Sequence, residues 1–133
     1  MPGKDTNIGA KRARQARAAL GLDDVSPVRC VLSLVEDGAS LPVGVGALPE
    51  KIAGALYRNG MGSIVWVNGK QSVERQRFTV AHEYGHVCCG HEGRQLDTQA
   101  IISGATHDPR EVQANGFAAQ LLAPRAGDRK SVV

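Results

Sequence analysis

Apolar positions in the first part of the chain recur with the spacing of helices. Residues 9–20 are rich in Ala and Arg and predict a helix that ends near Gly21. Ser26 and Pro27 suit an N-cap and a first helical position, and apolar residues follow them at helical spacing. We therefore predict a second, amphipathic helix over residues 27–36.

The middle of the chain carries the β-rich runs and turn residues of a small sheet. Residues 53–57 and 63–67 flank a Gly-containing loop, which predicts a β-hairpin. Residues 41–45 predict a short strand, and Pro42 confines it to an edge because proline has no N–H for a sheet hydrogen bond. Strand 63–67 could offer an exposed edge that pairs with an extended substrate, or the N-terminal helices could cover that edge.

A longer helix is predicted after the hairpin. Ser72 can cap its start, and the helix is expected to run to about Cys89, where Gly90 stops it. Residues 91–107 lack a clear period and are interpreted as a loop with one short turn around residues 98–102.

A last helix is expected to open at Asp108 and Pro109 and to end before Pro124. The order of helix, helix, strands, helix, loop, helix predicts an α+β fold. We expect a short antiparallel or mixed sheet packed on the helix of residues 72–89 and on flanking helices. A chain of 133 residues has room for one such core.

Composition adds a charge pattern to this picture. The net charge is +3, and the first 17 residues hold five cations against a single acid, Asp5. The cations are Lys4, Lys11, Arg12, Arg14 and Arg17. We interpret this basic arm as a solvated helix face, because it carries no aromatic or Gly-rich nucleic-acid signature. Direct nucleic-acid binding is therefore not expected.

The cysteines and the hydropathy bear on the compartment. Cys30, Cys88 and Cys89 are odd in number and form no CxxC pair, which fits reduced thiols better than disulfides or a zinc ribbon. We expect all three to be small buried residues. Because the sequence shows neither a signal peptide nor an apolar run long enough for a membrane span, we predict a cytoplasmic protein without a membrane partner.

The chemistry-bearing motif is HExxH, formed by His82, Glu83 and His86 within the predicted helix. Residues four apart lie on one helix face, so both imidazoles can reach a single Zn²⁺. Glu83 points elsewhere and suits a general base that takes a proton from water. A surface helix with two solvated histidines is the plain alternative, and the position inside a helix argues against it.

A catalytic zinc site needs a third protein ligand, for which Glu111 is the candidate. Glu111 lies on the apolar face of the last helix, and Asn115, one turn on, could accept the N–H of a ligand histidine. Glu111 also fits a capping box with Asp108, in which it would only close the helix end. Local sequence leaves these two interpretations open.

Two motifs resemble the ImmA/IrrE family of metallopeptidases. Residues 75–86, RQRFTVAHEYGH, are similar to that family's RxRFTLAHELGH, and residues 111–124, EVQANGFAAQLLAP, are similar to ExxANxFAAxLLMP. The resemblance covers about residues 26–124, with Tyr84 in place of the usual Leu. It implies a small zincin-like metalloprotease domain with His82, His86 and Glu111 as zinc ligands and Glu83 as general base.

The resemblance also implies a function and a division of the chain. We expect a zinc-dependent endopeptidase that cleaves a regulatory protein, often a helix-turn-helix repressor. The alternative is a non-catalytic regulator that contains zinc and binds a repressor or DNA. The expected parts are the basic helical arm of residues 1–25, the zinc metallopeptidase domain of residues 26–124 and a C-terminal tail of residues 125–133.

The sequence also supports expectations about the positions of four other residues. His91 follows the helix stop and is expected to be a solvated loop residue. His107 could stabilise an oxyanion from the loop, although a plain loop histidine beside an N-cap is the favoured interpretation. Trp66 and Tyr57 are expected to pack the hairpin against the zinc helix.

Overall fold

The computed structural model describes residues 3–122, so the predicted tail of residues 125–133 lies outside the described part. The elements in chain order are α1 (Lys4–Ala19), α2 (Val31–Ser33), the π-helical turn η1 (Leu34–Gly38), β1 (Val43–Gly46), β2 (Ile52–Asn59), β3 (Gly62–Asn68), α3 (Val73–Cys88), β4 (Arg94–Thr98), α4 (Gln99–Ile102) and α5 (Pro109–Leu122). The sheet has the order β1-β3-β2-β4. The predicted α+β class is confirmed.

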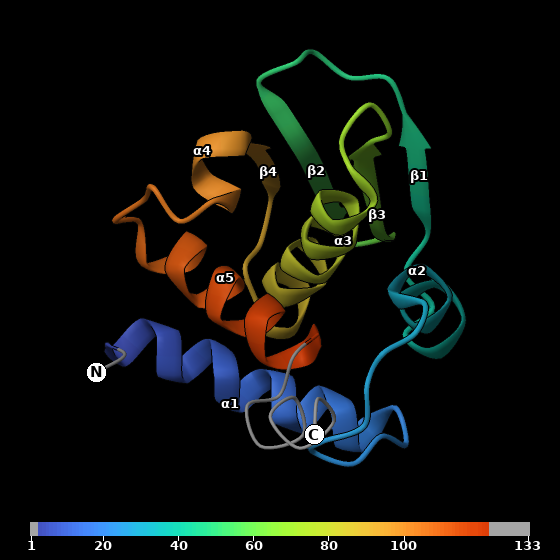
Figure 1. The fold of residues 1–133 in the computed structure, drawn as a ribbon, viewed down its shortest axis with the longest axis vertical. Helices are drawn as coiled ribbons and strands as arrows, with labels where there is room; N and C mark the ends of the chain where they lie inside the picture. The colour runs from blue at the N-terminus through green and yellow to red at the C-terminus, as the bar shows by residue number, and fades with distance from the viewer. Residues whose placement is uncertain (1–2, 123–133) are drawn as a thin grey trace.

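The layers follow one another from the sheet to the N-terminal helix (Figure 1). α3 packs on β2 and β3, α5 packs on α3, and α1 packs on the far side of α5. β1 runs parallel to β3, whereas β2 is antiparallel to both β3 and β4. The mixed sheet is thus covered on one face by α3, which carries the HExxH motif to the centre of the molecule.

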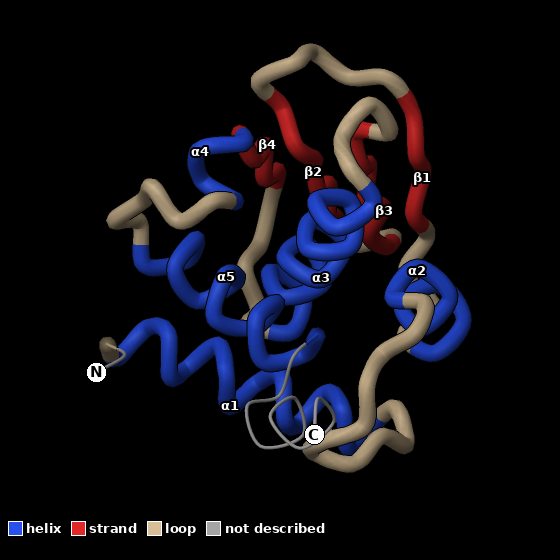
Figure 2. The backbone as a smooth tube through the Cα atoms, in the orientation of Figure 1, coloured by secondary structure: helices blue, strands red, loops and turns tan. Residues whose placement is uncertain are grey.

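The predicted second helix begins later than expected. The segment after α1 runs as a long loop (Figure 2), and the helix starts only at Val31. Ser26 is not an N-cap, because its backbone N–H donates to the Asp23 carboxylate at 2.6 Å, beside a 2.9 Å bond from Val25. The Asp23 side chain thus closes a local turn that competes with helix formation.

The hairpin is confirmed, with β2 and β3 joined at Gly60 and Met61, and β1 is confirmed as an edge strand. Neither alternative for the edge of strand 63–67 holds, since β3 lies between β1 and β2 and both of its edges are paired with strands. The strands at the two ends of the sheet are β1 and β4.

Trp66 and Tyr57 do not pack against α3, contrary to expectation. Each is 46% exposed, whereas Leu56 and Val65 are buried in the core. Alternation along the strands decides this, since neighbouring residues point to opposite faces. The Trp66 ring instead covers Gly44 on the outer face, where a Cβ at that glycine would overlap it.

β4 was not predicted, and the interpretation of residues 91–107 as a loop is wrong over Arg94–Thr98. The short turn around residues 98–102 is confirmed as α4, whose Thr98 hydroxyl accepts from the backbone N–H of Ile101 at 3.3 Å. A five-residue strand with no apolar alternation depends on its pairing with β2 rather than on local pattern.

α1 is a packed helix that begins at Lys4, five residues before the predicted start. Gly9 and Gly116 allow α1 and α5 to approach so closely that a Cβ at either would overlap backbone atoms of the other helix. Arg17, expected to be solvated, is fully buried. The helix therefore shares the core of the domain, and only its outer face is solvated; the domain limit at residue 25 stays a prediction.

The cysteines are free thiols in the structure. Cys88 and Cys89 are half-buried, whereas Cys30 is exposed, so the expectation that all three are buried is wrong. Along the described residues, no helix has the length and apolar character needed to cross a membrane.

Candidate metal centre

The HExxH helix is fixed at both ends by the predicted residues. The Ser72 hydroxyl accepts from the N–H of Arg75 at 3.1 Å, and Gly90 takes a positive φ of 77° that ends the helix. Between these ends, His82, Glu83 and His86 are fully buried. The motif therefore faces the interior, and the alternative of two solvated histidines is wrong.

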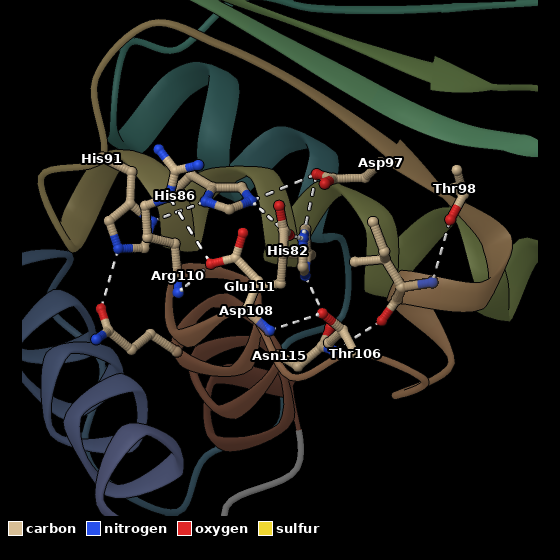
Figure 3. A network of polar contacts seen from close by, with 12 residues as sticks. His82, His86, His91, Asp97, Thr98, Thr106, Asp108, Arg110, Glu111 and Asn115 are labelled. Carbon is tan, nitrogen blue, oxygen red and sulfur yellow. Dashed lines mark hydrogen bonds and ion pairs between the residues drawn. The ribbon is translucent and has the colours of Figure 1, made fainter.

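Glu111 of α5 reaches these histidines. Its Oε1 lies 3.0 Å from Nε2 of His82 and 3.1 Å from Nε2 of His86 (Figure 3). The capping role belongs to Asp108, whose carboxylate accepts from the N–H of Arg110 at 3.0 Å. Glu111 is thus turned into the site rather than toward the helix end.

Asp97 of β4 completes the cluster and was missed in the sequence. Its Oδ2 lies 3.1 Å from Nε2 of His82 and 3.4 Å from Nε2 of His86. The donor atoms of His82, His86, Asp97 and Glu111 all lie within 4.8 Å of one another. No local signal marks Asp97, because the strand that carries it into the site was itself unpredicted.

The tautomer of His82 follows from its other partner. The Asn115 amide donates through Nδ2 to the carbonyl of Ile101 at 2.9 Å, which leaves its Oδ1 facing Nδ1 of His82 at 2.8 Å. That oxygen can only accept, so Nδ1 carries the proton and the Nε2 lone pair of the neutral ring points at the carboxylates. Asn115 thus lies where the sequence interpretation placed it.

His86 is oriented by a longer chain of hydrogen bonds. The Asp5 carboxylate accepts from Nε2 of Gln113 at 2.9 Å, and the Gln113 oxygen faces Nε2 of His91 at 3.0 Å. Nδ1 of His91 then lies 2.8 Å from Nδ1 of His86. Because the Gln113 oxygen can only accept, Nε2 of His91 carries the proton and its Nδ1 is the acceptor. Nδ1 of His86 therefore donates to His91, and the lone pair on Nε2 of His86 also points into the site.

The expectation of a solvated His91 is wrong, since the residue is only 7% exposed. The backbone N–H of His91 donates to the carbonyl of His86 at 2.9 Å, and the backbone N–H of Gly90 donates to the carbonyl of Val87 at 3.1 Å. These two hydrogen bonds form a Schellman motif. This turn folds the chain back over the last helical turn. The Gly90 stop was the signal that could have placed His91 beside His86.

The donor set fits a metal ion. Two imidazole lone pairs converge on two carboxylate oxygens, at separations of 3.0 to 3.4 Å. Ligand atoms of a tetrahedral zinc site with bonds of ~2.0–2.1 Å lie about 3.3 Å apart. Without a cation, these lone pairs would repel one another.

The pKa of His82 indicates the same preference for positive charge. Burial lowers this pKa, but the Asp97 and Glu111 carboxylates outweigh that effect and raise it to about 9. The site therefore favours a cation between Nε2 and the carboxylates, either a proton or a metal ion.

Glu83 stands beside the cluster with no hydrogen-bond donor. Within the described residues, neither oxygen of Glu83 nor either oxygen of Asp97 receives a hydrogen bond. Burial, followed by the hydrogen-bonding contact with Asp97 and by the charges of Asp97 and Glu111, raises the pKa of Glu83 well above its usual value. Its Oε2 lies close to the backbone at Gly54, where a side chain would meet it and Thr79. An unpartnered buried carboxyl group costs stability, which marks Glu83 as a functional candidate.

His107 lies away from this arrangement. It is exposed in the loop before α5, as the plain interpretation favours. The structure does not bring it together with His82, His86, Asp97 and Glu111.

These features agree with a known family. Residues 47–130, well over half of the chain, match the peptidase M78 family, described as the IrrE N-terminal-like domain, and the chain belongs to it. The match begins at residue 47 rather than near residue 26, so α1, α2 and β1 lie outside it. No curated protein matches the chain. The protein is thus a member of a metallopeptidase family with a buried group of side chains that could bind a metal ion.

Proposed function

We propose that the protein is a zinc-dependent endopeptidase that hydrolyses a peptide bond in a regulatory protein, with a helix-turn-helix repressor as the expected substrate. The observation that carries the proposal is the convergence of two oriented histidine lone pairs and two carboxylates beside the unpartnered Glu83. The choice of a repressor rests on the resemblance to the ImmA/IrrE family. We expect the protein to meet such a substrate in the cytoplasm.

The residues divide the chemistry among them. His82, His86 and Glu111 would hold the zinc ion, with Asn115 and His91 fixing the two rings through their Nδ1 atoms. When bound, zinc supplies Lewis-acid polarisation of a peptide carbonyl and lowers the pKa of water. Glu83 is buried beside these ligands and is placed to take a proton from water. Glu83 would then return that proton to the leaving amine.

The oxyanion role considered for His107 is not part of this proposal. An exposed loop side chain outside the cluster has no fixed position from which to donate. Direct DNA binding is not proposed either, because Arg17, one of the five cations of the basic arm, is buried and holds the fold together.

The test is to load the protein with zinc and incubate it with helix-turn-helix proteins and with a peptide library. We expect one zinc per chain and a defined cut, both lost on chelation and in His82→Ala. Glu83→Gln should keep the zinc and lose the cut. Zinc bound at full occupancy with no cleavage of any substrate would refute an endopeptidase.

A non-catalytic regulator is the second candidate, and one observation favours it. With Asp97 the cluster offers four protein ligands, as closed structural zinc sites do. Tight binding of an intact repressor by the zinc-loaded protein, unaffected by Glu83→Gln, would support this function.

A further inference from the structure

Asp97 is the one member of the cluster that the two recognised motifs do not contain. We propose that Asp97 is a fourth metal ligand that closes the site in the form described here, and that it must withdraw before a substrate is hydrolysed. The inference rests on the proposed function, because it assumes that the cluster binds zinc.

Burial and the lack of partners support a ligand role for Asp97. The residue is 0% exposed, and its polar neighbours among the described residues are the Nε2 atoms of His82 and His86 and the Glu83 carboxyl group; none of them is a fixed hydrogen-bond donor to it. A buried carboxylate without a donor destabilises the fold, and a bound metal ion offsets that cost. Arg58 and Arg110 are directed elsewhere, since one donates to the carbonyl of His91 and the other lies near Asp108.

Asp97 and Glu111 approach the histidines from two sides in equivalent ways. Glu111 is 3.0 and 3.1 Å from the Nε2 atoms, and Asp97 is 3.1 and 3.4 Å from the same atoms. These four separations are near the ~3.3 Å edge of a tetrahedral zinc site. A fourth metal bond accounts for the position of Asp97 close to both rings.

A four-ligand site has a consequence for activity. Catalytic zinc sites keep one position open, whereas closed tetrahedral sites are structural. The side chains of His82, His86 and Asp97 have no exposed surface, and that of Glu111 is 8% exposed. The described form therefore gives a substrate carbonyl neither a free position nor a path to the metal.

The position of Asp97 in the sheet allows it to leave. Among the strands of the described residues 3–122, β4 lies at the end of the sheet and pairs with β2 alone. The register between β2 and β4 is irregular between Ile52 and Gly54, and Gly54 is the partner of Asp97. Such irregularities bend a strand locally and can re-aim a side chain. A small shift of β4 would withdraw Asp97 while α3 and α5 hold the other ligands.

Cobalt(II) provides the test, because its visible spectrum reports the number of ligands. Purified wild type, Asp97→Ala and Asp97→Asn are loaded with cobalt and titrated with azide, a small anion that takes an open position. Asp37→Ala, which removes an exposed carboxylate from η1, is the matched control. Thermal unfolding of each variant confirms that it is folded.

We expect wild type and Asp37→Ala to show a four-coordinate spectrum that azide does not change. Asp97→Ala should bind azide with an affinity at least about tenfold higher, as expected if the closed form makes up most of the wild-type population. Asp97→Asn should fall between them, since an amide oxygen is a weaker ligand.

Equal azide binding by wild type and Asp97→Ala would overturn the inference while leaving zinc binding and hydrolysis intact. Failure of the wild type to bind cobalt or zinc at all would instead refute the proposed function, and the closing role of Asp97 with it. Peptide cleavage by zinc-loaded Asp97→Ala at or above the wild-type rate would further support a closing ligand, whereas loss of cleavage with an unchanged cobalt spectrum would assign Asp97 to the chemistry.

Discussion

Two regions of this small domain bury charged side chains completely, and they differ in whether those side chains have hydrogen-bond partners. Arg17 of α1 is 0% exposed, as are Glu83 and Asp97. Nε and Nη2 of Arg17 donate to the carbonyl of Leu121 at 3.2 and 2.9 Å. The guanidinium also donates to the carbonyls of Asp23 at 2.5 Å and Ser26 at 2.6 Å.

The Arg17 region is therefore satisfied, whereas the carboxylates of Glu83 and Asp97 have no donor among the described residues. The first arrangement ties the end of α1 to the last turn of α5 and to the loop before α2. The second arrangement is stable only when a cation binds beside the carboxylates. Burial of charge alone does not mark a functional site; burial of charge without partners does.

The largest expected effect separates activity from stability at Glu83. Glu83→Gln should lower the rate of peptide cleavage by about 10²–10⁴, because the general base is lost. Its free energy of unfolding without metal should not fall, since the carboxyl group that the variant replaces has no hydrogen-bond donor. Cleavage assays and denaturant unfolding measure the two quantities, with exposed Glu74→Gln on the same helix as control. A strongly destabilised Glu83→Gln would show that the carboxyl group has a structural partner.

Arg17→Ala should instead have its main effect on the free energy of unfolding. It leaves three carbonyl groups without their donor and should lower the free energy of unfolding by about 3 kcal/mol, since hydrogen bonds from charged groups contribute ~1.5–3 kcal/mol each and are not additive. Arg14→Ala removes an exposed cation from the same helix and should change stability by less than about 0.5 kcal/mol. Equal effects of the two substitutions in urea unfolding would show that the hydrogen bonds of the buried Arg17 do not stabilise the fold.

The hydrogen-bond chain to His86 should have an intermediate effect. His91→Ala removes the acceptor that fixes the His86 ring, so zinc affinity should fall by about 10–100-fold. Competition with a fluorescent chelator measures this change. His107→Ala, an exposed histidine outside the cluster, should leave the affinity unchanged.

The smallest expected effect tests whether α1, which carries Arg17, also helps to orient the metal ligands. Asp5 is on α1 with Arg17, and its carboxylate bonds Gln113 at the outer end of the chain to His86. Asp5→Ala should lower stability by about 1 kcal/mol, the typical value for one hydrogen bond, and zinc affinity by a few-fold at most. Combining Asp5→Ala with His91→Ala should then cost less zinc affinity than the sum of the single changes, because both act through one path. Full additivity would mean that α1 does not orient the metal ligands.

Elements that depend on neighbouring residues could be predicted from the amino-acid sequence. The cap at Ser72, the stop at Gly90 and the pairing of His82 with His86 one turn apart are local, so α3 and its motif could be predicted. The hairpin and the start of α5 followed from turn and capping residues in the same way. Glu111 was ambiguous from local sequence; the second motif of the family favoured a ligand role, and the structure places its Oε1 beside both histidines.

Features that join distant segments of the chain could not be predicted in this way, because they depend on long-range packing. β4 has no pattern of its own and exists through its pairing with β2, so Asp97 could not be placed in the site from the sequence. His91 looked solvated until α5 supplied Gln113 to cover it. Arg17 looked like part of a basic arm, yet its partner Leu121 lies 104 residues away. Local propensities set the helices, while the satisfaction of buried polar groups depends on which elements meet, and that is fixed by long-range packing.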